Sequence, residues 1–148
     1  MKVLVDTSIW SLALRRRKPS SPEVAELSRL IEEGLVEMIG PIRQEILSGI
    51  SQARQFELLK SELSSFEDLS LARRHFETAA EFYNQCRKHG IQGSHTDFLI
   101  CSVASHENLA VFTIDRDFVA YSKWLPMALH PLQKILRLFG DFKKSHTG

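Results

Sequence analysis

Acidic residues follow two short apolar segments of the chain. Residues 3–5 run directly into Asp6, and residues 109–113 are followed by Asp115 and Asp117. A short, wholly apolar run is typical of a strand buried on both faces, as in a parallel sheet. Ligands of such sheets bind beyond the carboxyl ends of the strands. If the two strands are parallel neighbours, we expect their acids to meet at one edge of the sheet.

Two further acids are expected at the starts of helices. Glu45 follows Gly40-Pro41, a pair that favours the first turn of a helix. Asp97 begins the segment 96–107, whose apolar residues indicate a helix. Carboxylates that gather without basic partners repel one another, and a hard cation such as Mg²⁺ or Mn²⁺ relieves that repulsion. Because a dication held in this way activates water and stabilises charge on phosphate, the acidic set indicates hydrolysis of phosphodiester bonds.

Each acid also has a structural interpretation that involves no chemistry. Asp6 fits the N-cap of a following helix, and Asp115 or Asp117 fits a turn or a cap. Residues 94–97, Ser-His-Thr-Asp, match the capping box at a helix start. Glu45 could be a solvated acid on a helix surface. No single residue is specific, so the hypothesis depends on the joint placement of these acids.

Strands that alternate with helices predict a three-layer α/β/α sandwich around a mostly parallel central sheet. One domain is expected over residues 1–132, followed by a polar C-terminal tail at 133–148. We expect strands at residues 3–5, 35–39, 66–69 and 109–113 and an edge strand within 126–132. We expect helices at residues 9–13, 23–33, 41–50, 52–62, 71–89 and 96–107 and a short helix or turn from 118.

Length and composition favour a single globular domain. The 148 residues are 43% hydrophobic and 25% charged, which suits a chain that folds around one core. The formal net charge is only +1, so a nucleic-acid surface would have to be local. Cys86 and Cys101 form no CxxC pair, which argues against a thiolate zinc site. No apolar run approaches the ~20 residues of a spanning helix, and we expect a cytoplasmic protein.

Basic residues are densest in the run Arg15, Arg16, Arg17 and Lys18, shortly after the helix that Asp6 precedes. This run could bind RNA phosphates near the acidic edge, or it could be a solvated loop. Arg116 lies between two acids, where it could neutralise them, contact phosphate or occupy an exposed turn. The histidines show no ligand spacing and no HExxH motif, so a histidine-based zinc hydrolase is disfavoured.

Four segments of the sequence carry a resemblance to a known family. They are Val-Asp-Thr-Ser-Ile-Trp at 5–10, Pro-Ile-Arg-Gln-Glu-Ile-Leu-Ser-Gly at 41–49, Thr-Asp-Phe-Leu-Ile-Cys-Ser-Val-Ala at 96–104 and Phe-Thr-Ile-Asp-Arg-Asp-Phe at 112–118. In order and spacing they resemble the PIN-domain family and, more narrowly, the VapC-type toxins of bacterial and archaeal toxin–antitoxin pairs. The resemblance spans residues 1–132, and the tail after Leu132 has no clear counterpart in the family.

The resemblance implies an endoribonuclease that uses Mg²⁺ or Mn²⁺, is commonly a homodimer and is inhibited by a cognate, VapB-like antitoxin. Carried over residue by residue, it implies four acidic metal ligands, which are Asp6, Glu45, Asp97 and Asp115. Thr7 or Thr113 would assist as a polar neighbour, and Asp117 would be an auxiliary acid or a structural residue.

Two other classes of function remain as alternatives. A PIN-like module could have kept the fold for regulatory binding without catalysis. A phosphoacceptor receiver domain also gathers acids around Mg²⁺, but it needs paired early acids, and Asp6 has no acidic neighbour in the sequence. A phosphatase of the Asp-x-Asp type is disfavoured because Ser8 stands where the second aspartate should be.

Overall fold

The computed structural model describes residues 1–15 and 21–131, which contain a four-stranded, all-parallel sheet in the order β2-β1-β3-β4. The strands are β1 (Val3–Val5), β2 (Val36–Glu37), β3 (Ala110–Phe112) and β4 (Ala128–Leu129). The predicted parallel sheet, with a late strand at its edge, is therefore confirmed. The expected tail, 133–148, lies outside the described residues.

The short strand expected at 66–69 is wrong, because this segment contributes only a single parallel bridge, between Met38 and Asp68. The guanidinium of Arg43 donates to the backbone carbonyls of Leu63 and Phe66 and to the Asp68 carboxylate. One side chain thus anchors the segment, and Leu69 adds a backbone hydrogen bond to Met38 without extending the bridge into a strand.

β1 and β3 lie side by side at the centre of the sheet, with Val5 opposite Phe112. All residues of both strands are buried, as expected for a parallel sheet covered on both faces. The backbone N–H of Asp6 donates to the Phe112 carbonyl at 2.9 Å. The residues that follow the two strands, Asp6 and Thr113, therefore reach the same edge of the sheet.

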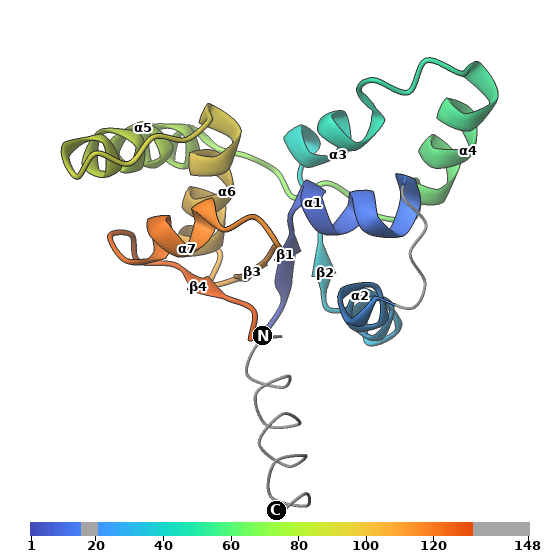
Figure 1. The fold of residues 1–148 in the computed structure, drawn as a ribbon, viewed down its shortest axis with the longest axis horizontal. Coiled ribbons are helices and arrows are strands. Elements are labelled where there is room, and N and C mark those ends of the chain that lie inside the picture. Colours follow the sequence, from blue (N-terminus) through green and yellow to red (C-terminus); the bar gives the residue numbers. More distant parts are fainter. Residues whose placement is uncertain (16–20, 132–148) are drawn as a thin grey trace, which may run out of the picture.

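Helices cover both faces of the sheet, which confirms the α/β/α sandwich. In Figure 1 the strands rise toward the top, with α1 to α4 beside β2 and α5 to α7 beside β3 and β4. A π-helical turn, η1 (Ser11–Arg15), continues the first helix. The α-helices of the described residues are α1 (Thr7–Trp10), α2 (Pro22–Glu32), α3 (Gly40–Leu47), α4 (Ala53–Leu63), α5 (Arg73–Lys88), α6 (His95–His106) and α7 (Asp117–Ser122).

The core is densest around α6, because residues 98–104 of that helix are all buried. Helix α5 packs along it with Ala79, Phe82 and Cys86, and Gly90 ends α5 with a φ of +74°, a left-handed conformation that glycine adopts without strain. This packing fixes where α6 begins, and α6 carries one of the predicted site residues in its first turn. None of the helices in the described part of the chain is both long and apolar enough to span a membrane.

Candidate metal centre

Asp6 joins the first strand, the first helix and the loop after β3. It is 6% exposed and N-caps α1 by accepting from the Ser8 backbone N–H at 3.4 Å. The same oxygen, Oδ2, accepts from the Ser8 hydroxyl at 2.8 Å and from the Thr113 hydroxyl at 2.9 Å. The N-cap interpretation of Asp6 is therefore correct, and it coexists with a position at the carboxyl edge of the sheet.

The loop after β3 is held by hydrogen bonds that run from one acid to the next. Thr113 Oγ1 accepts from the Asp115 backbone N–H at 2.9 Å, and Asp115 Oδ1 accepts from the Asp117 backbone N–H at 3.0 Å. The Ile114 N–H donates to Ser8 Oγ at 3.2 Å and ties this loop to α1. These bonds place Asp115 and Asp117 beside the carboxyl end of β3.

Asp97 enters the same region from the first turn of α6. Its backbone N–H donates to the Ser94 hydroxyl at 3.1 Å, so Ser94 is the N-cap that the sequence predicts. Its carboxylate accepts at Oδ2 from the hydroxyl of Tyr121 on α7, at 2.7 Å. Burial, followed by the hydrogen bond to Asp97, raises the pKa of Tyr121, so the hydroxyl stays protonated and acts as a donor.

The structure brings three of the acids to one point. One carboxylate oxygen from each of Asp97, Asp115 and Asp117 lies within 4.8 Å of the other two. Asp6 and Glu45, predicted as ligands, do not belong to this trio, whereas Asp117, predicted as auxiliary, does. Direct coordination by all three would draw their oxygens closer, since Mg²⁺–oxygen distances are about 2.1 Å.

Electrostatic effects nevertheless link Glu45 on α3 to the other acids. Glu45 is exposed as a whole residue, yet desolvation of its carboxyl and the negative charge of Asp6 raise its pKa, with a smaller effect from Asp97. Burial likewise raises the pKa of Asp97, and the charges of Asp6 and Asp115 add to the rise. Each raised pKa means that ionising these carboxyls together costs free energy.

A divalent cation fits this environment. None of the ion pairs within residues 1–15 and 21–131 involves Asp6, Glu45, Asp97, Asp115 or Asp117. The Thr7 hydroxyl oxygen is buried and lies close enough to the Glu45 carboxyl to oppose the rise in its pKa. Oxygen donors and uncompensated negative charge are the features that Mg²⁺ or Mn²⁺ binding would satisfy.

Comparison with known families decides which family this chain belongs to, because the family model of the PIN domain matches residues 3–123. The chain belongs to the PIN domain family. No curated protein sequence gives a significant match. The four motif segments thus lie in a PIN domain that spans most of the chain.

Solved structures share the fold of this PIN domain at low sequence identity. FitAcB from Neisseria gonorrhoeae has a TM-score of 0.69 and 22% identity, over 88% of this chain and 98% of that chain. VapBC2 from Rickettsia felis, bound to a DNA fragment from their promoter, has a TM-score of 0.71 and 19% identity over the same shares. VapBC-1 from nontypeable Haemophilus influenzae has a TM-score of 0.69 and 16% identity, over 90% of this chain and 99% of that chain.

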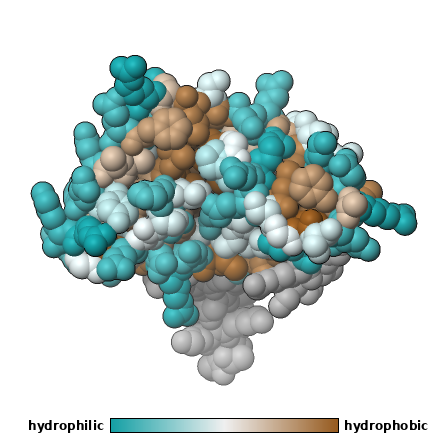
Figure 2. Space-filling model, turned by 90° about the horizontal axis from the view of Figure 1, so that it is seen from above, coloured by the Kyte–Doolittle hydropathy of each residue, from teal (hydrophilic) through white to brown (hydrophobic). Residues whose placement is uncertain are grey.

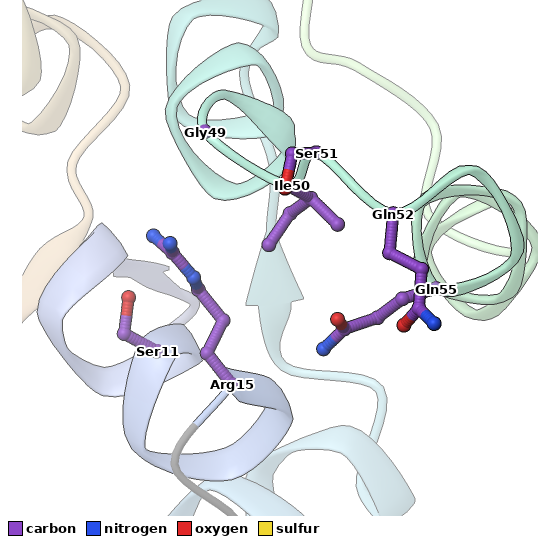
Figure 3. A pocket seen from close by; sticks show the side chains of 7 residues that line it. All are labelled: Ser11, Arg15, Gly49, Ile50, Ser51, Gln52 and Gln55. Carbon is purple, nitrogen blue, oxygen red and sulfur yellow. The ribbon is translucent and has the colours of Figure 1, made fainter.

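A polar groove lies beside the first helix of the PIN domain. Its volume is about 470 Å³, and Ser11 and Arg15 of η1 face residues 49–52 and Gln55 across it (Figure 3). The Arg15 guanidinium approaches Gly49. Of the predicted RNA-binding residues, Arg15 therefore lies in a groove and Arg116 is exposed at the start of α7. The others, Arg16, Arg17 and Lys18, lie outside the described residues.

A second groove is mainly apolar and lies among α3, α5 and α6. It has a volume of about 380 Å³, and its lining includes Pro41, Phe76 and Leu99. Phe76 is 53% exposed, although it is a large apolar residue. Figure 2 looks down on the face where the strands end, and it shows two hydrophobic areas separated by polar surface.

Two residues at the acidic edge were missed by the sequence analysis. Ser8 bonds Asp6 and the Ile114 N–H, and Tyr121 bonds Asp97. Ser8 stands two residues after the N-cap Asp6, within reach of the capping side chain. Tyr121 stands four residues after Asp117, so both project from one face of α7. These spacings are the signals that were available.

Proposed function

We propose that this chain is a metal-dependent endoribonuclease, the toxin of a toxin–antitoxin pair, which hydrolyses RNA phosphodiester bonds with Mg²⁺ or Mn²⁺. The observation that carries the proposal is the convergence of Asp97, Asp115 and Asp117 within 4.8 Å, next to Asp6, in a chain of the PIN domain family. PIN domains are typically metal-dependent nucleases, and the four motif segments resemble VapC-type toxins.

In this proposal the acids hold the ion at the carboxyl edge of the sheet. Its ligands, direct or through water, are Asp6, Glu45, Asp97 and Asp115, with Asp117 as a further acid. When bound, the ion would place positive charge next to the scissile phosphate and make water more acidic. Thr113 and Ser8 orient the Asp6 carboxylate through their hydroxyls. Thr7 would assist through its hydroxyl, which lies beside the Glu45 carboxyl.

The proposed RNA-binding surface adjoins the acids. Arg15 and Arg116 are both exposed, and Arg116 follows Asp115 directly, so either guanidinium can bind backbone phosphate by charge-assisted hydrogen bonds. Arg16, Arg17 and Lys18 are further RNA-binding candidates on the sequence alone. We propose a cytoplasmic location for this reaction.

We further propose two protein partners, a VapB-like antitoxin and a second copy of this chain. Several structures that share the fold are VapBC or FitAB assemblies. We assign the apolar groove at Phe76 to the second copy, because buried apolar surface favours obligate dimers.

A non-catalytic PIN-like module remains the second candidate, whereas membership of the PIN domain family leaves the receiver alternative without support.

The proposed nuclease activity is tested with purified protein and RNA. The protein should cleave RNA in the presence of Mn²⁺ or Mg²⁺, and cleavage should stop when EDTA removes the ion. Asp6→Asn should abolish cleavage, because it removes one negative charge without changing the size of the side chain. Asp68→Asn is the matched control, since that aspartate pairs with Arg43 and does not belong to the acidic trio. Equal cleavage by Asp6→Asn and wild type would overturn the proposed metal site, and no cleavage by wild type would support the non-catalytic module.

A further inference from the structure

Tyr121 is a buried aromatic residue with one polar atom aimed at the acidic edge. Its relative exposure is 0%, and its ring packs against Phe98 and Phe118 with centroid distances of 4.9 and 5.2 Å. The hydroxyl donates to Asp97 Oδ2 at 2.7 Å. A buried tyrosine hydroxyl needs a partner, and here that partner is a carboxylate of the proposed metal site.

Gly93 provides the space that this hydroxyl occupies. A Cβ atom at position 93 would lie 2.2 Å from the Tyr121 hydroxyl oxygen and 2.8 Å from its Cζ. These distances are far below van der Waals contact, so any larger residue at 93 has to displace the phenol. The φ of Gly93 is not in the left-handed region. A Cβ here would also lie 3.0 Å from Phe98 Cε2, so the close approach of Tyr121 and Phe98, and not backbone conformation, is what requires glycine.

We propose that Tyr121 is a positioning residue, whose hydroxyl holds the Asp97 carboxylate in the orientation that faces Asp115 and Asp117, and that Gly93 admits this hydroxyl. The inference rests on the proposed function, because it assigns a role within the same metal site. Tyr121 itself need not touch the ion or the RNA.

The physical basis is the orientation of a carboxylate at the end of a rotatable bond. A hydroxyl-to-carboxylate hydrogen bond of this length is charge-assisted and stronger than a neutral one. It opposes rotation of the Asp97 carboxylate and leaves its other lone pairs for the ion. Removing groups that orient metal ligands commonly lowers metal affinity by about 10–100-fold.

The first test is Tyr121→Phe in the full chain, because this change removes the hydroxyl and keeps the ring between Phe98 and Phe118. We expect the Kd for Mn²⁺, measured by calorimetry, to rise about tenfold or more. We also expect kcat for RNA cleavage at limiting Mn²⁺ to fall while KM for RNA stays the same. Tyr83→Phe is the matched control, because the Tyr83 hydroxyl bonds Arg87 and not an acid of the site. Its Mn²⁺ affinity should equal that of wild type.

The second test is a double-mutant cycle with Gly93→Ala. The added methyl should displace the hydroxyl and weaken Mn²⁺ binding in the wild-type background. In the Tyr121→Phe background the hydrogen bond is already absent, so Gly93→Ala should weaken Mn²⁺ binding little further. Near-UV circular dichroism and Tm of each variant separate this coupling from a general loss of folding.

The outcomes distinguish this inference from the proposed function. Equal or tighter Mn²⁺ binding by folded Tyr121→Phe overturns the positioning role, even if wild type cleaves RNA. Weaker Mn²⁺ binding by that variant upholds the role, even if no RNA is cleaved and the nuclease proposal fails. Additive effects of Gly93→Ala and Tyr121→Phe overturn the role of Gly93, and a wild type that binds no Mn²⁺ overturns both proposals.

Discussion

The Thr113 hydroxyl donates a 2.9 Å hydrogen bond to Asp6 Oδ2, which joins the residue after β3 to the residue after β1. The same hydroxyl oxygen accepts from the Asp115 backbone N–H at 2.9 Å. One threonine therefore contacts the carboxylate that follows β1 and the backbone of the acid that follows β3. The parallel pairing of β1 with β3 brings these residues to the same edge, and the hydroxyl fixes their relative orientation.

Replacing Thr113 by valine should loosen this edge at little cost in packing, because the two side chains have similar shapes. The Asp6 carboxylate loses a hydrogen-bond donor and the Asp115 N–H loses its acceptor. We therefore expect the free energy of unfolding to fall by about 1–2 kcal/mol. Mn²⁺ affinity should fall as well. Urea unfolding and calorimetry measure the two effects. Thr78→Val is the control, since the Thr78 hydroxyl bonds His106 on the exposed side of α5. A Thr113→Val protein with wild-type Mn²⁺ affinity would contradict the positioning by Thr113.

Asp117→Asn should weaken Mn²⁺ binding as strongly as Asp115→Asn, because the structure places both carboxylates with Asp97 in one trio. We expect the Kd of each variant to rise about tenfold or more. Calorimetric titration with Mn²⁺ measures this directly. If Asp115→Asn loses affinity and Asp117→Asn does not, Asp117 serves the start of α7 and is no ligand.

Glu45→Gln should stabilise the metal-free protein at neutral pH. Desolvation and the charge of Asp6 raise the pKa of Glu45 above its ordinary value of 4.5, so the folded protein binds this proton more tightly than the unfolded chain does. Wild type therefore loses the associated stability as the pH rises from 4.5 through the raised pKa. Glutamine carries no charge at any pH in this range and therefore loses no stability in this way. The unfolding free energy of Glu45→Gln should accordingly rise relative to that of wild type as the pH increases.

Urea unfolding in EDTA at pH 4 and pH 7 measures this difference. Glu57→Gln is the matched control, because the Glu57 side chain is 69% exposed and lies outside the acidic edge. Added Mn²⁺ should reverse the order at pH 7, since the ion binds wild type more tightly and stabilises the folded state. Greater stability of metal-free wild type at pH 7 would be evidence against uncompensated charge at Glu45.

Phe76→Glu should disrupt the proposed dimer, because it places a charge in the apolar groove among α3, α5 and α6. Light scattering coupled to size exclusion should report a dimer mass for wild type and a monomer mass for this variant. Leu58→Glu on α4 is the matched control, since Leu58 is 52% exposed and Phe76 is 53% exposed. The Leu58 variant should stay dimeric, and identical masses for the two variants would reject the groove as the interface.

The sequence by itself determined the two central strands and the segments that carry the acids, although it also predicted a strand at 66–69 that is absent from the described sheet. Short apolar runs at residues 3–5 and 109–113 are compatible with little besides buried strands, and a parallel sheet places their following residues at one edge. Ser94 as the N-cap of α6 was also readable, because capping is a local interaction between residues three apart.

Only the tertiary structure decided which acids converge and what orients them. Asp117, and neither Asp6 nor Glu45, joins Asp97 and Asp115 within 4.8 Å, because that distance depends on how α6 and α7 pack against β3. The Tyr121 hydroxyl reaches Asp97 through space left by Gly93, a contact among three separate segments. Such contacts depend on side-chain rotamers and on where each helix lies in a close-packed core. The pattern of apolar residues along the sequence specifies neither of these.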